Sequence, residues 1–183
     1  MSISQLNTKQ LIEKCLVQNQ EAQLEIYNRY YKAMYNVAYR ILNDAQEAED
    51  VMQEAFLKAF LKLDTLKESK LFGGWLKKIT INLSIAALRK TNRFVSAPLD
   101  KVEHLIKEDN DVENTVFDSA KDVEAILSAI STLKSSYSVV LTLHYIEGFD
   151  YEEMAEILKL TEGNIRTLIS RAKVSLRKKL EVI

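Results

Sequence analysis

Helical spacing of apolar residues is the feature that most limits the fold of this 183-residue chain. Apolar side chains recur three and four residues apart over most of the length, a pattern that predicts amphipathic α-helices. The chain also contains only four glycines and one proline. Sheet-rich folds need many turns, and turns draw on these two residues, so their scarcity favours an all-α fold.

Three helices are expected within residues 1–93, which together predict a first helical domain. An Asn43-Asp44 pair separates the first two helices, and the polar, Lys-rich segment 64–71 separates the second from the third. The expected inner faces are Leu24, Tyr27, Tyr31, Met34, Ala38 and Ile41 in the first helix; Ala48, Val51, Met52, Ala55, Phe56, Ala59 and Leu63 in the second; and Trp75, Leu76, Ile79, Leu83 and Ala86 or Ala87 in the third.

Residues 94–120 are expected to form a linker between two domains. The segment is acidic, contains the single proline and shows little periodicity. A stretch of this length without secondary structure is unusual inside one compact domain. A second domain is therefore predicted over residues 121–183, and it begins with helices over 123–133 and 137–146.

Turn and capping residues divide the rest of the second domain. Gly148 suits the left-handed end of a helix, and Asp150 can cap a helix from Tyr151 to Lys159. Thr161 can cap a final helix that begins at Glu162. This helix–turn–helix arrangement would place its second helix in the major groove of DNA.

The outward side of the final helix carries the residue types that contact DNA. Amides, hydroxyls and cationic groups suit base edges and phosphates. The candidates for base or phosphate contact are Glu162, Asn164, Arg166, Thr167, Ser170, Arg171 and Lys173. An ordinary helical hairpin with a solvated basic face would show a similar pattern.

Charge alternates along the chain although the net charge is only −1. Residues 44–54 carry five acids and no base, whereas residues 58–93 carry nine bases and two acids. Residues 95–125 are acidic again, and residues 159–179 carry seven bases and one acid. The blocks indicate two basic faces for a polyanion and an acidic face for a basic partner.

Three motifs resemble extracytoplasmic-function (ECF) sigma factors of the sigma-70 family, and they occur in that family's order. EAEDVMQEAFLKAF (47–60) is similar to the region 2 helix that docks on RNA polymerase, and FGGWLKKITINLSIAALRK (72–90) is similar to the promoter-melting helix. The stretch 129–180, which includes EGFDYEEMAEIL and ISRAKVSLRKKL, resembles the region 4 domain. The resemblance covers almost the whole chain and implies a two-domain promoter-specificity subunit of RNA polymerase.

The resemblance also implies roles for particular residues. Asp50, Gln53, Glu54, Phe56 and Leu57 match the surface that binds the basic clamp helices of the polymerase largest subunit. Lys62–Lys70 correspond to the loop that captures an extruded base of the −10 element. The −10 candidates are Lys70, Phe72, Trp75, Lys78, Asn82, Arg89 and Lys90, of which Phe72 and Trp75 are also expected as core residues under the site. The final helix would read the −35 element.

Four positions depart from the family pattern. Lys134 stands where proline is usual, and Ser138 replaces a usual arginine. Lys159 occupies the customary turn glycine, where a left-handed lysine would cost about 1 kcal/mol. Leu168 replaces a residue that is often basic. These departures limit the transfer of individual −35 contacts from the family.

Composition and motifs point away from other classes of protein. The N-terminus lacks a secretory signal, and no apolar run approaches the roughly 20 residues of a membrane span. The single cysteine, Cys15, fits a reducing cytoplasm and is expected as a buried small hydrophobe on an N-terminal helix. His104 and His144 stand apart from Cys and from each other, so no metal site is expected. The resemblance to sigma factors implies a protein that has no cofactor and is not an enzyme itself.

Two other functions remain open from the residues alone. One is a two-domain helix-turn-helix regulator that never joins the polymerase, and the other is a helical interaction protein without a DNA role. For a sigma factor the resemblance implies three partners: core RNA polymerase, promoter DNA and an anti-sigma factor that is often membrane-anchored.

Overall fold

A computed structural model describes residues 2–94 and 120–181, with side chains from residue 123 onward in the second part. All but the ends of the expected linker 94–120 therefore lies outside the described residues. Every regular element in the described parts is helical, which confirms the all-α fold. The chain divides into two compact units, Met1–Asn92 and Arg93–Ile183.

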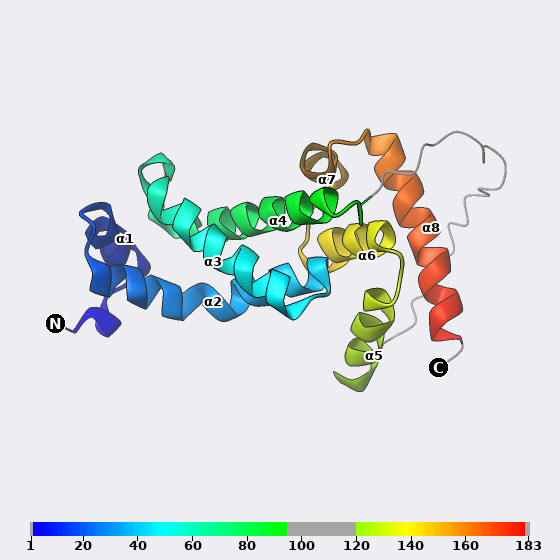
Figure 1. Cartoon of the computed structure of the whole chain (residues 1–183), viewed down its shortest axis with the longest axis horizontal. Helices are drawn as coiled ribbons and strands as arrows, with labels where there is room; N and C mark the ends of the chain where they lie inside the picture. Colours follow the sequence, from blue (N-terminus) through cyan, green and yellow to red (C-terminus); the bar gives the residue numbers. More distant parts are fainter. Residues whose placement is uncertain (1, 95–119, 182–183) are drawn as a thin grey trace. The chain divides into compact units, whose positions relative to one another are not determined.

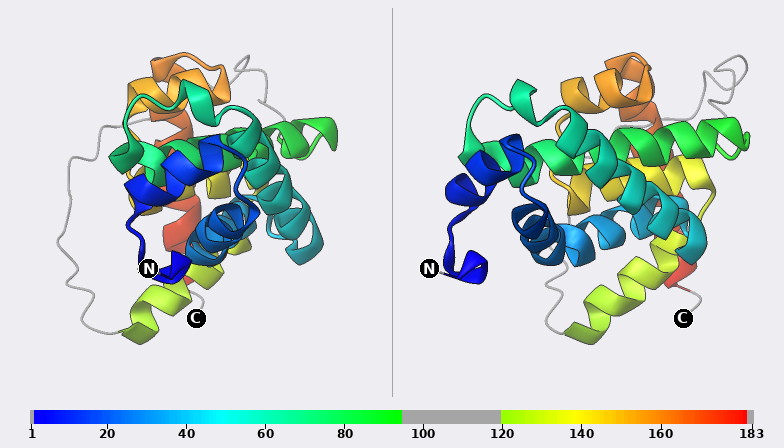
Figure 2. Two further views of the ribbon diagram at one scale, coloured as in Figure 1. Left: turned by 90° about the vertical axis from the view of Figure 1, so that its left-hand side faces the viewer. Right: turned by 60° about the vertical axis from the view of Figure 1, so that its left-hand side comes forward.

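The first unit is built on three long helices, α2 (Gln20–Leu42), α3 (Ala45–Leu61) and α4 (Phe72–Lys90), which pack against one another (Figures 1 and 2). A shorter helix, α1 (Thr8–Leu16), packs on α2 and follows the 3₁₀ turn η1 (Ile3–Gln5). Two further 3₁₀ turns, η2 (Leu63–Thr65) and η3 (Ser69–Leu71), connect α3 to α4.

Local side-chain chemistry sets the helix boundaries in this unit. Asn43 ends α2 in the left-handed conformation with φ 53°, which asparagine tolerates better than most residues. The Asp44 carboxylate then accepts from the Glu47 backbone N–H at 2.9 Å and caps α3. The expected break at this pair is confirmed.

The buried face of α4 differs from the expected one. Thr80 and Ser84 are buried at its centre, whereas Ala86 is exposed and Trp75 only half-buried. The two hydroxyls donate to the carbonyls four residues earlier, at 3.0 Å for Thr80 and 2.9 Å for Ser84. Because their polar groups are satisfied within the helix, these small side chains can lie where α4 packs on its neighbours.

The buried face of α2 matches the expected one at Met34, Ala38 and Ile41 but differs from it nearer the start of the helix. Leu24, expected inside, is 60% exposed, while Ala22 and Ile26 are fully buried. Tyr27 and Tyr31 lie half-buried beside the core with stacked rings, 5.5 Å between centroids. The tyrosines therefore flank the buried face of α2, and Leu24 lies beyond them.

The second unit contains α5 (Ala120–Ser131), α6 (Ser135–Leu141), the π-helical turn η4 (Thr142–Ile146), α7 (Tyr151–Leu158) and α8 (Glu162–Leu180). Helix α8 packs on α5, α6 and α7 (Figure 1). The expected helix over 137–146 begins two residues earlier and widens into the π-helical turn. Val123 and Leu127, expected on the inner face of α5, are exposed at 53% and 38%.

Neither a membrane span nor a metal cluster is found in the described parts of the chain. No helix there is long and apolar enough to cross a bilayer. No three His, Cys, Asp or Glu side chains of residues 2–94 and 123–181 are grouped to hold a metal ion. Cys15 is buried in the core of the first unit, as expected, and burial raises the pKa of its thiol from 9.0 to about 11.

Candidate nucleic-acid interface

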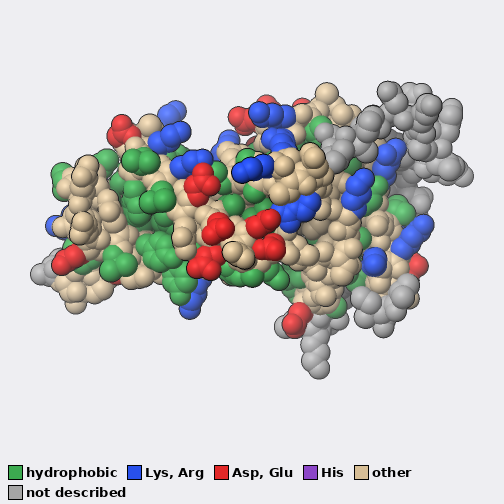
Figure 3. All heavy atoms as spheres, viewed as in Figure 1, with side chains coloured by type: hydrophobic (Ala, Val, Ile, Leu, Met, Phe, Trp, Pro, Cys, Tyr) green, Lys and Arg blue, Asp and Glu red, His purple; other side chains and the backbone are tan. Residues whose placement is uncertain are grey.

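An exposed acidic face runs along α3. Asp50, Gln53, Glu54 and Leu57 are all exposed and lie on one side of the helix, since they recur at spacings of three and four residues. Figure 3 shows acidic side chains gathered over this part of the first unit. The Glu54 carboxylate pairs with Lys58 at 2.8 Å in an exposed ion pair, which contributes little to stability.

Phe56 does not belong to this exposed face. Its side chain is 3% exposed, and its ring lies 4.9 Å from that of Tyr27, so it belongs to the core and can only support the surface from beneath. An apolar residue that the sequence analysis missed, Leu61, is 82% exposed. It follows Leu57, 65% exposed, by one helical turn. The face is thus an acidic surface with two apolar side chains, and the four-residue spacing of these leucines was the signal that could have found it.

The outer side of α4 carries the second group of candidates. Lys78, Asn82 and Lys90 are exposed and Arg89 is half-buried. Lys78, Asn82 and Arg89 recur at spacings of four and seven residues, so they form one polar and basic stripe, and Lys90 lies beside its end. A stripe of donors of this kind suits the phosphates and bases of a nucleic-acid strand.

Two aromatic candidates lie in the first turn of α4, before that stripe begins. Phe72 is fully buried and meets the Tyr30 ring edge-on at 5.3 Å between centroids. It cannot stack on a base, so its contribution to the site is structural. Trp75 is half-buried, packs beside the core and lies 6.0 Å from the Phe72 ring.

In the second unit, α7 and α8 form a helix-turn-helix with the expected caps. The Asp150 carboxylate accepts from the Glu153 backbone N–H at 2.8 Å, and the Glu153 side chain accepts from the Asp150 N–H at 3.1 Å. The Thr161 hydroxyl accepts from the Asn164 N–H at 3.2 Å. Both predicted caps are confirmed.

The turn between α7 and α8 has the predicted left-handed residue. Lys159 adopts φ 50° and ψ 47°, and its N–H bonds to the Ala155 carbonyl. Gly148 at the preceding turn has φ 80°, also as predicted. Buried Ile157, Leu158 and Ile165 then hold the two helices together across the turn.

The exposed side of α8 carries the third group of candidates, and Figure 3 shows Lys and Arg side chains along this helix. Its buried side is formed by Ile165, Ile169 and Ala172. The structure places Glu162, Arg166 and Lys173 as exposed and Asn164, Thr167, Ser170 and Arg171 as half-buried. Together these side chains give α8 a polar surface with three cations and one acid, of the kind that contacts DNA.

The Arg166 side chain makes two contacts with other side chains of the same unit. Its guanidinium lies over the Tyr151 ring, 5.0 Å from the centroid, and one of its nitrogens lies 3.8 Å from the Glu162 carboxylate. Val174, which the sequence analysis missed, is 50% exposed on the outer side of the same helix. Val174 follows Thr167, one of the candidates, by seven residues, and this spacing was the sequence signal that could have placed it on the same side of the helix.

Comparisons with known proteins give a family match in each of the two units. The family model described as Sigma-70 region 2 matches residues 26–94, and that described as Sigma-70, region 4 matches residues 123–176. The chain is 31% identical over 179 residues to the ECF RNA polymerase sigma factor SigW of Bacillus subtilis, covering 94% of this chain and 96% of that protein. It is 27% identical over 185 residues to the ECF RNA polymerase sigma-E factor of Escherichia coli K12, covering 97% and 96%.

Two solved structures share the fold. One is CnrH in complex with the cytosolic domain of CnrY, with a TM-score of 0.54 and 22% identity, covering 94% of this chain and 96% of that one. The other is the sigma factor RpoE in complex with the anti-sigma factor NepR from Bartonella quintana, with the same TM-score and identity, covering 86% and 96%.

Proposed function

Since the chain belongs to the family of ECF RNA polymerase sigma factors, we propose that it binds core RNA polymerase, recognises the −10 and −35 elements of a promoter and assists DNA melting. The observation that carries this proposal is the occurrence of two helices with exposed polar and basic side chains, α4 and α8, in one chain with the acidic face of α3. In this account the chain is an initiation factor that works in the cytoplasm. The nucleotide chemistry belongs to the polymerase.

Each unit has its own part of this function. Residues 1–93 form the region 2-like domain, which binds polymerase and opens the −10 element, and residues 121–183 form the region 4-like domain, which reads the −35 element. Residues 94–120 link them. The matches to region 2 over 26–94 and to region 4 over 123–176 support this division.

The acidic face of α3 is the polymerase-binding surface. Asp50, Gln53, Glu54 and Leu57 are exposed together on it, and Leu61 extends it by one turn. Its charge is opposite to that of the basic clamp helices of the polymerase largest subunit. Such complementarity mainly speeds encounter and fixes the register of the two surfaces.

The outer stripe of α4 is the −10 surface. Asn82 offers an amide for a base edge, and Lys78, Arg89 and Lys90 offer charges for phosphates, as Lys70 does from η3. Replacing Asn82 by Ala should slow promoter opening without changing stability by more than about 0.5 kcal/mol, because the side chain is exposed. Asn36→Ala, an exposed asparagine on α2, is the matched control.

The outer side of α8 is the −35 surface. Arg166, Thr167 and Asn164 lie in its first two turns and are the candidates for base edges, with Glu162 at the first position. Ser170, Arg171 and Lys173 lie further along the helix and are assigned to the DNA backbone. The N-terminal part of a recognition helix usually makes the base contacts.

An anti-sigma factor is a further proposed partner. The two structurally similar proteins were each solved as complexes, one of them with an anti-sigma factor by name. A partner of this kind would inhibit the chain by covering the α3 face and the α8 surface, and a membrane anchor on it would keep the chain away from DNA.

Co-purification with core RNA polymerase tests the proposal. The full chain should bind core enzyme, and reversing Asp50 and Glu54 to Lys should weaken that binding without lowering the affinity for duplex promoter DNA. Reversing two other exposed acids of the first unit, Glu13 and Glu21, is the matched control. A folded chain that fails to bind core enzyme would instead be a helix-turn-helix regulator that acts outside the polymerase.

A further inference from the structure

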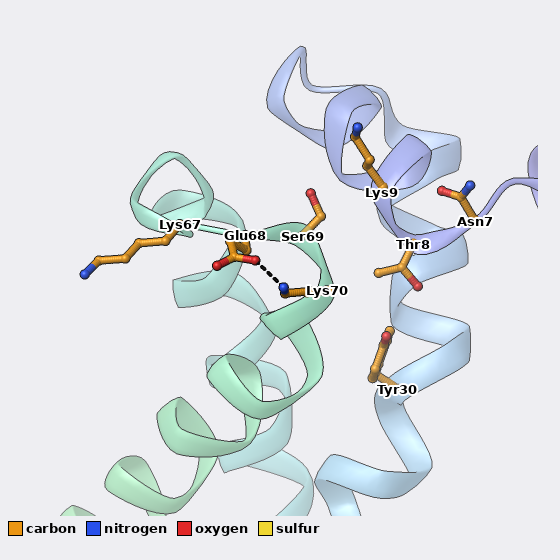
Figure 4. Close-up of a pocket in the computed structure, with 8 residues that line it drawn as sticks. All are labelled: Asn7, Thr8, Lys9, Tyr30, Lys67, Glu68, Ser69 and Lys70. Atoms are coloured by element: carbon orange, nitrogen blue, oxygen red, sulfur yellow. Dashed lines mark ion pairs between the residues drawn. The ribbon is translucent and has the colours of Figure 1, made fainter.

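A polar hollow lies in the first unit between α1 and the loop that joins α3 to α4. Figure 4 shows these two walls facing each other, with Tyr30 of α2 between them. The Tyr30 ring is held there by its edge-on contact with Phe72, 5.3 Å between centroids. Lys70, one of the −10 candidates, is part of the lining, so the hollow belongs to the surface already described. A basic surface without an assigned role lies in the second unit, at the end of α8.

The last turn of α8 carries three cations beyond the proposed −35 contacts. Arg177, Lys178 and Lys179 are all exposed. Cations in the last turn of a helix interact favourably with its dipole whichever side of the helix they occupy. A role in binding would instead depend on the side from which each side chain projects. The positions of the three around the helix therefore distinguish the two cases.

Two of these cations continue the side of α8 that is proposed to face DNA. Residues seven apart lie on nearly the same side of a helix. Arg177 follows Ser170 by seven residues, and Lys178 follows Arg171 by the same interval. Ser170 and Arg171 are both −35 candidates, and Figure 3 shows Lys and Arg side chains along this helix. The proposed DNA-facing side thus remains cationic up to the last turn.

Lys179 projects from a different side of the helix. It follows Ala172 by seven residues, and Ala172 is fully buried against the rest of the second unit. Lys179 therefore shares the charge and the helical turn of Arg177 and Lys178 but not their side of α8. This difference makes it a matched control for the other two.

The length of α8 indicates which part of the DNA these side chains would reach. At a rise of 1.5 Å per residue, Lys178 lies about 16 Å along the helix from Thr167, a candidate for base contact. The major groove is only about 12 Å wide. A helix that inserts its first turns into the groove therefore carries its last turn past the edge of the groove, where the phosphates lie.

We propose that Arg177 and Lys178 bind phosphates of duplex DNA beside the −35 element and that Lys179 does not. The naming of the adjoining element as a −35 element rests on the proposed function. Phosphate contacts position a protein on DNA without reading its sequence. The two residues therefore add to the affinity for any duplex and hold α8 in register, while the choice of bases is left to its first turns.

Duplex binding by the full chain tests this proposal. The probe is a fluorescein-labelled duplex of mixed sequence, and binding is followed by fluorescence anisotropy over a range of salt concentrations. Arg177→Ala and Lys178→Ala should each weaken binding and reduce the slope of log K against log salt by about 0.9, the loss of one phosphate contact on B-form DNA. Lys179→Ala should leave the slope unchanged. Alanine has the highest helix propensity, so all three variants should keep α8 intact, which circular dichroism checks.

Three results would overturn the proposal. Equal falls in slope for the three variants would show that the general charge of the helix end acts on binding. An unchanged slope in both Arg177→Ala and Lys178→Ala would exclude the phosphate contacts, and if these variants also lost binding to core polymerase, the two cations would bind an acidic protein surface instead. Absence of any duplex binding by the folded native chain would exclude the contacts as well.

A second duplex of different sequence separates phosphate contacts from base contacts. Arg177→Ala and Lys178→Ala should weaken binding to the two duplexes by the same factor. A loss confined to one duplex would show that these residues read bases, and the phosphate assignment would be overturned. The assay contains no polymerase, so failure here leaves co-purification with core enzyme intact, and failure to co-purify leaves this assay readable.

Discussion

The guanidinium of Arg166 rests on the face of Tyr151, with its central carbon 5.0 Å from the ring centroid. Tyr151 is itself stacked on His144, 5.0 Å away between ring centroids, and the His144 Nδ1 atom lies 2.9 Å from the Phe149 carbonyl oxygen. The turn before α7 therefore builds an aromatic support for a side chain of α8. If Arg166 contacts DNA as proposed, this support fixes its side chain beforehand and lowers the entropy cost of binding.

Replacing Tyr151 should weaken DNA binding only when the ring is lost. An exposed cation–π contact contributes about 0.5–1 kcal/mol, so Tyr151→Leu should lower affinity for promoter duplex by about two- to five-fold. Tyr151→Phe keeps an aromatic face and should bind almost as the native chain does. Fluorescence anisotropy with duplex DNA measures both.

A double-mutant cycle makes this assignment specific. If the ring acts through Arg166, then Tyr151→Leu should cause no further loss in an Arg166→Ala background. Additive losses would show that Tyr151 acts on DNA binding by another route.

The paired glycines at the start of α4 should respond differently to alanine. A Cβ at Gly74 meets nothing within 4 Å, whereas one at Gly73 lies 3.2 Å from the Tyr30 ring. Gly74→Ala should therefore stabilise the first unit by about 0.5–1 kcal/mol. Gly73→Ala should gain less or lose stability, because the fixed Tyr30 ring must move.

Urea unfolding followed by Trp75 fluorescence measures this difference, since Trp75 is the only tryptophan and lies in the first unit. Equal stabilisation by the two alanines would mean that Tyr30 moves freely, and the account of its fixed position would be wrong.

Lys159 should be a site of easy stabilisation in the second unit. A non-glycine residue in the left-handed conformation costs about 1 kcal/mol, and Lys159 adopts it with φ 50°. Lys159→Gly should slow hydrogen exchange of the α7 and α8 amides by relieving that cost. Lys159→Ala removes the same charge without relieving the backbone and should not slow exchange. If Lys159→Ala slows exchange as much as Lys159→Gly does, the stabilisation comes from loss of the lysine charge and not from relief of the backbone conformation.

Cys15 should make stability fall at high pH. Burial raises the pKa of its thiol from 9.0 to about 11. The unfolded chain therefore loses this proton at a lower pH than the folded chain, so its contribution to stability is full below pH 9 and declines between about pH 9 and 11. Cys15→Ala should unfold with a weaker pH dependence over that range, measured by urea unfolding. Identical pH dependence in the two proteins would contradict a buried neutral thiol.

Local signals in the sequence predicted the helix ends well. The caps at Asp150 and Thr161 and the left-handed residues Gly148 and Lys159 all depend on a few neighbouring residues. Such features are decided by the backbone close by, so the sequence carries enough information to place them.

Features decided by distant packing were harder to predict. The buried face of α4 includes Thr80 and Ser84, because their hydroxyls are satisfied within the helix and small side chains fit there. Helix α1 packs beside η2 and η3, which lie far from it in the sequence, so no local signal predicts this contact. Among the candidate site residues, Phe56 and Phe72 are buried, as the apolar pattern around Phe56 and the expected core position of Phe72 predicted.

Transcription by core RNA polymerase with and without the chain tests the central claim most directly. Fragmented genomic DNA serves as template, and the 5′ ends of the transcripts are sequenced. With the native chain, start sites should share one −35 and one −10 element at constant spacing. With Asp50 and Glu54 reversed to Lys, those starts should be lost. Start sites that are unchanged by adding the folded native chain, or that lack shared elements, would contradict the account.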